Sequence, residues 1–141
     1  MKHIITVAIL AVALLGEVVN LEGLKYADLD LAKDAKCAVK DVSLRKYKRF
    51  VGVIQYNDGK KDVISSPKYT FQYLLEKGKK NHNGIYKVYV TDYKTRRFID
   101  AGGAHYVFGS TMMTPGGDDV IPFRKKADAQ QFKKEYSGSK I

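Results

Sequence analysis

The sequence is poor in residues and motifs that build disulfide-bonded folds and common enzyme sites. It has one cysteine, no tryptophan and three histidines among 141 residues. Because Cys37 is the only thiol, no internal disulfide can form. The sequence has no G-x-S-x-G pattern, no phosphate-binding glycine loop and no H-E-x-x-H pattern. We therefore expect a protein that binds its ligand or partner and is not an enzyme.

Negative charge is scarce relative to positive charge. The chain has 25 lysines and arginines against 15 aspartates and glutamates, which gives a formal net charge of +10. No helix-turn-helix, zinc-finger or aromatic RNA-binding pattern accompanies the basic clusters, so we expect no nucleic-acid partner. Such a surface attracts an acidic partner protein or an anionic membrane surface, or it only keeps the protein soluble.

The one long apolar run lies at the N-terminus. Lys2 precedes an uncharged stretch over residues 4–15, which is shorter than the roughly 20 residues of a membrane span but typical of a signal peptide. We expect residues 1–23 to form a signal peptide or N-terminal membrane segment. Residues 24–36 read as a linker or a short helix, and residues 37–141 as the folded domain of an exported protein. An uncleaved anchor or a buried core helix is the alternative for the apolar run.

Strand and turn signals divide the domain into two halves, at about 37–80 and 84–141. In the first half, strand-forming residues at 50–56 and 61–64 flank the turn Asn57-Asp58-Gly59. A helix is expected to follow, with Pro67 in its first turn and a stop at Gly78. Its expected buried face consists of Phe71, Leu74 and Leu75.

The second half repeats this order. Strands are expected at 85–91, 97–101, 104–108 and 120–123, with a loop over 110–119 and a final helix over 125–136. Gly102-Gly103 allows a bulge or a tight bend. The order of elements predicts an α+β fold with antiparallel sheets in two ββα-like halves.

Sulfur atoms are the most distinctive candidate ligands. Thiolate and thioether donors select Cu(I) over harder ions, and the candidates are Cys37, Met112 and Met113, with His105 near the methionines in sequence. The alternatives are core packing for the methionines and a half-buried strand position for His105. Cys37 is far from the other three along the chain, so only the fold can bring the four together.

Several segments resemble the NosL family over about residues 37–141. The turn Tyr56-Asn57-Asp58-Gly59-Lys60 and the helix start Ser65-Ser66-Pro67 belong to this resemblance. Further matching segments lie at 90–93, 98–101, 104–110, 114–117, 121–123 and 127–132. The resemblance implies a fold of two ββα-type units. It also implies a periplasmic or membrane-anchored accessory protein that supplies Cu(I) for the copper centres of nitrous oxide reductase.

This sequence departs from the family pattern at the metal-binding positions. Family members commonly carry C-x-x-C-G-M, whereas this chain has Cys37-Ala38-Val39-Lys40-Asp41-Val42, so Lys40 and Val42 replace a cysteine and a methionine. A family methionine in a short turn matches Gly116 here, and Met112 and Met113 are possible substitutes three or four residues earlier. The family position matching His105 is usually aromatic.

These observations lead to three hypotheses. The first is that Cys37, with Met113 or Met112 and with His105, holds one Cu(I) and passes it to a periplasmic copper enzyme or its assembly factors by ligand exchange. The second is a NosL-like scaffold without a metal site, whose basic face binds its partner. The third is a redox protein that uses the Cys37 thiol.

Overall fold

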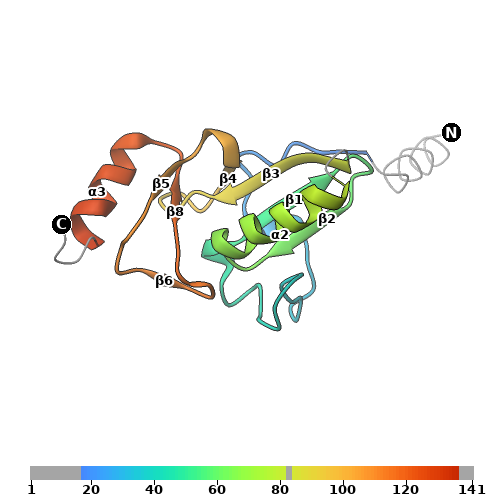
Figure 1. Cartoon of the computed structure of the whole chain (residues 1–141), viewed down its shortest axis with the longest axis horizontal. Coiled ribbons are helices and arrows are strands. Elements are labelled where there is room, and N and C mark those ends of the chain that lie inside the picture. The colour runs from blue at the N-terminus through green and yellow to red at the C-terminus, as the bar shows by residue number, and fades with distance from the viewer. Residues whose placement is uncertain (1–16, 82–83, 137–141) are drawn as a thin grey trace, which may run out of the picture.

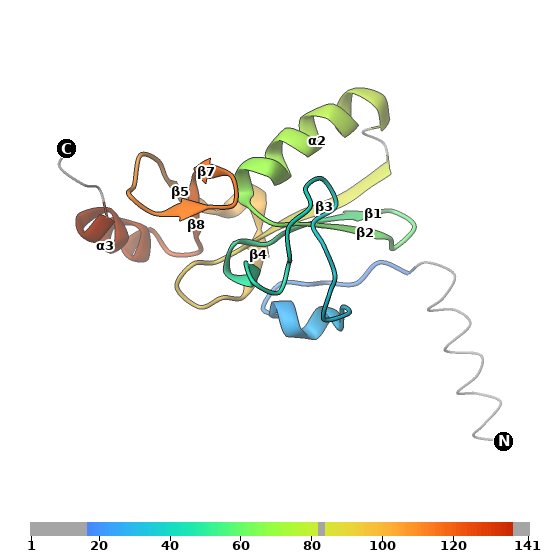
Figure 2. The same ribbon diagram turned by 90° about the horizontal axis from the view of Figure 1, so that it is seen from below.

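Four antiparallel strands form the largest sheet, in the order β2-β1-β3-β4. The computed structural model describes residues 17–81 and 84–136, so most of the expected signal segment lies outside it. The strands are β1 (Gly52–Tyr56), β2 (Lys61–Ile64), β3 (Ile85–Thr91) and β4 (Phe98–Asp100). Figure 2 shows helix α2 (Pro67–Asn81) on one face of this sheet and the 3₁₀ helix η1 (Tyr26–Leu29) on the other. The expected α+β class with antiparallel sheets is confirmed.

Strand β1 lies at the centre of the sheet and joins the two halves of the chain. It pairs with β2 through Val53 and Val63, and with β3 through Val53 and Tyr89. The first four residues of β1 are buried, because the sheet is covered on both faces. A side chain at Gly52 would overlap the Thr70 side chain, so glycine is what allows α2 to pack this closely on β1. The two halves therefore share one sheet.

The rest of the second half forms a separate small layer, visible at the left of Figure 1. Strands β5 (His105–Val107) and β8 (Ile121–Phe123) pair antiparallel, and helix α3 (Lys126–Tyr136) packs on them through Ala129 and Phe132. Between them in sequence, β6 (Met113–Thr114) and β7 (Gly117–Asp118) form a short hairpin where a loop was expected. The glycines at 102 and 103 lie in the 3₁₀ turn η4 (Ala101–Gly103).

Helix α2 differs from its sequence prediction in its length and its buried face. It continues past Gly78 to Asn81, because a glycine inside a helix costs only about 1 kcal/mol. Leu75, expected in the core, is 67% exposed, whereas Thr70 is fully buried. The Thr70 hydroxyl donates a hydrogen bond to the Ser66 carbonyl at 2.7 Å, so this polar side chain can occupy the buried face. The buried face of α2 is therefore rotated relative to the face that the spacing of its apolar residues predicts.

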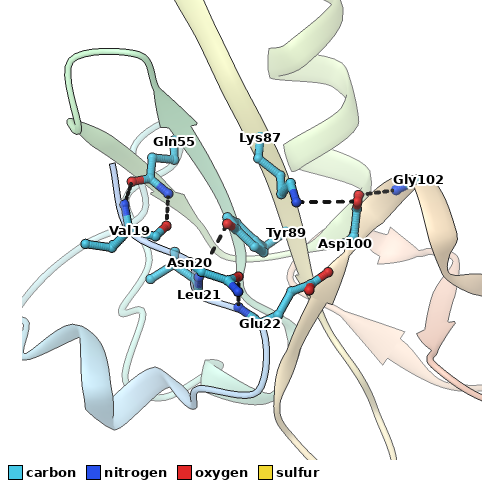
Figure 3. A network of polar contacts seen from close by, with 9 residues as sticks. All are labelled: Val19, Asn20, Leu21, Glu22, Gln55, Lys87, Tyr89, Asp100 and Gly102. Carbon is cyan, nitrogen blue, oxygen red and sulfur yellow. Dashed lines mark hydrogen bonds and ion pairs between the residues drawn. The ribbon is translucent and has the colours of Figure 1, made fainter. Parts of the chain in front are cut away.

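The segment before η1 is tied to the sheet by polar contacts, which Figure 3 shows. The buried Gln55 amide bonds both backbone groups of Val19, each at 2.8 Å, and the Leu21 N–H donates to the Tyr89 hydroxyl at 3.3 Å. Leu21 is only 2% exposed and belongs to the main apolar cluster with Val53 and Phe98. Residues expected to form the end of the signal segment thus contribute to the core.

A buried carboxylate joins the β6–β7 hairpin to the start of α2. Asp119 Oδ1 accepts a hydrogen bond from the Lys68 N–H at 2.9 Å, and Asp119 Oδ2 accepts one from the Thr114 hydroxyl at 2.6 Å. The first N–H groups of a helix have no partner within the helix, so the carboxylate satisfies one of them at the positive end of the helix dipole. The Tyr69 hydroxyl adds a second link by donating to the Pro115 carbonyl at 3.1 Å.

Substitution Leu21→Ala should lower the free energy of unfolding by about 2–5 kcal/mol, because it removes a fully buried side chain. Leu24→Ala is the matched control, since Leu24 is 37% exposed in the same segment. Chemical denaturation of the chain from residue 17 onward measures both. Equal effects of the two substitutions would contradict the placement of Leu21 in the core.

Substitution Asp119→Ala should destabilise the protein by about 1–3 kcal/mol, because it leaves the Lys68 N–H without its acceptor. Asp119→Asn keeps an acceptor and should destabilise less. Thermal or chemical denaturation measures the loss of stability in each variant. A larger loss in Asp119→Asn than in Asp119→Ala would argue against the link between the hairpin and the helix.

The same carboxyl should make stability depend on pH. Burial raises the pKa of Asp119 above its ordinary value of 3.8, although its hydrogen bonds act in the opposite direction. The folded protein therefore keeps this proton at pH values where the unfolded chain has lost it. Stability contributed by the neutral carboxyl falls as the pH rises through the folded pKa. The free energy of unfolding of the wild type, relative to Asp119→Asn, should decrease as the pH rises above 3.8. A difference in unfolding free energy between the two proteins that does not change with pH would contradict a raised pKa for Asp119.

Candidate metal-binding site

Cys37 lies in a tight loop that is fixed to the end of β2. Its backbone N–H donates to the Val42 carbonyl, and the Ala38 N–H donates to the Val63 carbonyl, each at 3.0 Å. The side chain is only 7% exposed, and its Sγ accepts a hydrogen bond from the Ser65 N–H at 3.3 Å. The single thiol is therefore held against the residues that open α2.

The hairpin β6–β7 contacts the same helix start. Lys68 and Tyr69, in the first turn of α2, bind the hairpin turn through the Gly116 and Pro115 carbonyls. Ser65, whose N–H meets the Cys37 sulfur, has a buried hydroxyl without a hydrogen-bond partner among residues 17–81 and 84–136. The Cys37 loop and the hairpin, which are far apart in sequence, thus both adjoin residues 65–69.

Two positions of the degenerate family motif also lie at this helix start. The Lys40 ammonium is 5.1 Å from the centre of the Tyr69 ring, which is a cation–π contact. At Gly116, a Cβ atom would lie 3.0 Å from Ser66 Oγ and 3.1 Å from Asp119 Oδ2. A side chain at Gly116 would therefore displace the polar cluster around Asp119. At these two positions the family resemblance implies a cysteine and a methionine, whereas this chain has a lysine and a glycine, neither of which supplies a sulfur donor.

The remaining predicted ligands lie in different environments. Met112 is partly buried and packs against the second apolar cluster, which includes Val107 and Ile121, whereas Cys37 belongs to the first. Met113, on β6 of the hairpin, is 60% exposed. His105 is exposed on β5, where it pairs with Phe123. Of the four, Cys37 and Met113 lie in segments that adjoin the start of α2, but Met113 is 60% exposed and its strand neighbour Thr114 is the residue that faces Asp119.

No preformed cluster of harder ligands accompanies the sulfurs. In the part of the chain that the structure describes, no group of three or more histidine, cysteine, aspartate or glutamate side chains is placed to hold a metal ion. Within the same residues, no helix is both long and apolar enough to cross a membrane.

Sequence reasoning missed Asp119 and the serines that precede α2 as parts of this corner. Asp119 and its partner Lys68 are 51 positions apart, and nothing in the local pattern around Asp119 predicts a helix cap. The Ser65-Ser66-Pro67 pattern predicted the helix start correctly, but it carried no information on what would pack against it.

Comparison with known proteins places the chain in a family. No curated protein matches the sequence. The fold is similar to that in the crystal structure of the copper chaperone NosL from Shewanella denitrificans, with a TM-score of 0.64 and 22% sequence identity, over 77% of this chain and 86% of that chain. The NosL family model matches residues 28–141, most of the chain, and NosL proteins are accessory proteins, not enzymes. The chain belongs to the NosL family.

Proposed function

We propose that this chain is a Cu(I)-binding accessory protein in which Cys37 anchors the ion and Met113 is the second ligand. The carrying observation is that the Cys37 sulfur and the hairpin of Met113 both adjoin the first residues of α2. Family membership and the fold likeness to a protein described as a copper chaperone support the same function. The ion would pass to a periplasmic copper enzyme, such as nitrous oxide reductase, or to its assembly factors.

The two sulfurs suit different parts of this task. Cu(I) prefers soft thiolate and thioether donors, so the only thiol is the natural anchor. Cys37 is 7% exposed, which shields a bound ion, whereas Met113 is 60% exposed and is accessible to an incoming ligand of a partner. Transfer by ligand exchange needs one donor that holds and one that releases. Met112 is engaged in packing, and His105 remains a candidate third ligand on β5.

The reduced protein should bind one Cu(I) in competition with a chelator of known affinity. Cys37→Ser should abolish binding, because it removes the only thiolate donor. Met113→Leu should weaken binding by about tenfold, which corresponds to the loss of one ligand contact of about 1.4 kcal/mol. Competition titration under anaerobic conditions measures each affinity.

Met112→Leu is the matched control. It removes the thioether next to Met113 in sequence, and the Met112 side chain packs against the second apolar cluster. It should leave the Cu(I) affinity unchanged. His105→Gln tests the third ligand. Absence of Cu(I) binding by the reduced wild-type protein, or equal affinity of wild type and Cys37→Ser, would reject the proposed site.

A second candidate function is a NosL-like scaffold that binds a partner without copper. Lys40 favours it, because its ammonium lies at the same helix start and would repel a cation bound there. If copper binds at this corner, Lys40→Gln should raise the Cu(I) affinity by about threefold to tenfold, since it removes one nearby like charge. Lys133→Gln, on helix α3, is the control. A protein in which neither wild type nor Lys40→Gln binds Cu(I) would support the scaffold.

A further inference from the structure

A pocket of about 430 Å³ is lined mainly by cationic side chains, on the side of the sheet opposite α2. Its walls come from η1, the residues that follow it, the segment around the 3₁₀ helix η2 (Lys48–Phe50) and the turn between β3 and β4. No aspartate or glutamate lines it. The charged residues of its lining are Lys25, Lys33, Arg45, Lys48, Arg49 and Arg96.

These charges lack ion-pair partners in the described part of the chain. The ion pairs among residues 17–81 and 84–136 are formed by Lys36, Lys60 and Lys87, none of which lines the pocket. Asp28, next to the pocket in sequence, uses its carboxylate to accept a hydrogen bond from the Lys25 backbone N–H at 2.8 Å. Six like charges around one small volume repel one another, so an anion there would relieve the repulsion.

The Arg49 side chain and the Arg96 backbone are held in place before any ligand binds. The Arg49 guanidinium stacks over the Tyr93 ring at 4.3 Å, and its buried Nε has no hydrogen-bond partner among the described residues. Arg96 has a positive φ of 65°, a strained conformation for a residue with a side chain, and its N–H donates to the Asp92 carbonyl at 2.8 Å. A guanidinium held in place like that of Arg49 favours carboxylate or phosphate oxyanions, which it binds through two parallel hydrogen bonds.

We propose that this pocket binds a ligand that carries two or more phosphate groups. A single carboxylate would leave most of the six charges unmatched, whereas two phosphate groups bring about two negative charges as diesters and about three to four as monoesters. The volume falls within the usual range of small-molecule sites, and Tyr26 and Leu31 give an apolar wall for an organic part of the ligand. The phosphates belong either to a soluble compound or to a lipid headgroup with two phosphates. This site is independent of the proposed copper function.

Calorimetric titration of the whole chain with inorganic pyrophosphate, at constant ionic strength, tests the pocket. Wild type should bind pyrophosphate with a stoichiometry of one and gain thermal stability from it. Arg45→Gln and Lys48→Gln should each bind about tenfold more weakly, since each removes one charge-assisted contact. Both variants should keep or raise the ligand-free melting temperature, because they reduce like-charge repulsion. Lys133→Gln on α3 is the control and should bind as the wild type does.

A second arm identifies the source of the phosphates. Phosphatidylcholine vesicles with and without cardiolipin, a lipid with two phosphates, are tested for binding in the presence and absence of pyrophosphate. Cardiolipin-dependent binding that pyrophosphate displaces assigns the site to a lipid, and pyrophosphate binding without vesicle binding assigns it to a soluble ligand.

The proposal is overturned if pyrophosphate does not bind at physiological ionic strength, or if the two pocket variants bind it as tightly as the wild type. Binding of a peptide rich in aspartate and glutamate, in place of pyrophosphate and with the same sensitivity to Arg45→Gln, also overturns the phosphate assignment. That result would indicate an acidic protein partner.

Discussion

The hydrogen bonds of the Asp119 carboxylate hold together the part of the molecule on which the functional proposal depends. This side chain comes from the segment after the β6–β7 hairpin, yet it binds a free N–H at the start of α2. The first N–H groups of a helix have no partner within the helix, so a side-chain oxygen that accepts from one of them stabilises the contact between the two segments. It holds the hairpin of the second half against Lys68 and Tyr69, next to Ser65, whose N–H contacts the Cys37 sulfur of the first half.

At the corner formed in this way, the chain lacks the sulfur donors that the family resemblance implies at residues 40, 42 and 116. Only one cysteine remains, Lys40 brings a positive charge, and the space beside Gly116 is occupied by polar side chains. A bound Cu(I) would therefore have fewer protein ligands than the family pattern implies. Low coordination by one buried thiolate and one accessible thioether is suited to handing the ion on rather than storing it, because exchange with a partner's ligand starts from an incompletely enclosed ion.

Local patterns predicted most of the secondary structure, because it depends on neighbouring residues. Strands 61–64 and 85–91 occur with the expected bounds, and the serine–proline pattern marked the start of α2. Contacts between distant residues were beyond such patterns. The segment of Leu21 is held to the sheet by a hydrogen bond from its N–H to the Tyr89 hydroxyl. The rotated face of α2 depends on the hydrogen bond of the Thr70 hydroxyl to the Ser66 carbonyl.

The candidate site shows the same limit. The sulfur chemistry was visible in the sequence, since donor type alone points to Cu(I). The sequence could not distinguish Met112, which packs against an apolar cluster, from its exposed neighbour Met113, because it does not show which parts of the chain pack against each side chain. The cationic pocket was equally hidden, as its six charges come from four separate segments that only the fold brings together.

X-ray absorption at the copper edge of the Cu(I)-loaded protein tests the central claim most directly. The account predicts two sulfur ligands, at about 2.3 Å if these bonds resemble those to zinc. It also predicts that one of the two is lost in Met113→Leu. A first shell of nitrogen and oxygen alone, or a shell unchanged in that variant, would contradict a site built from Cys37 and Met113.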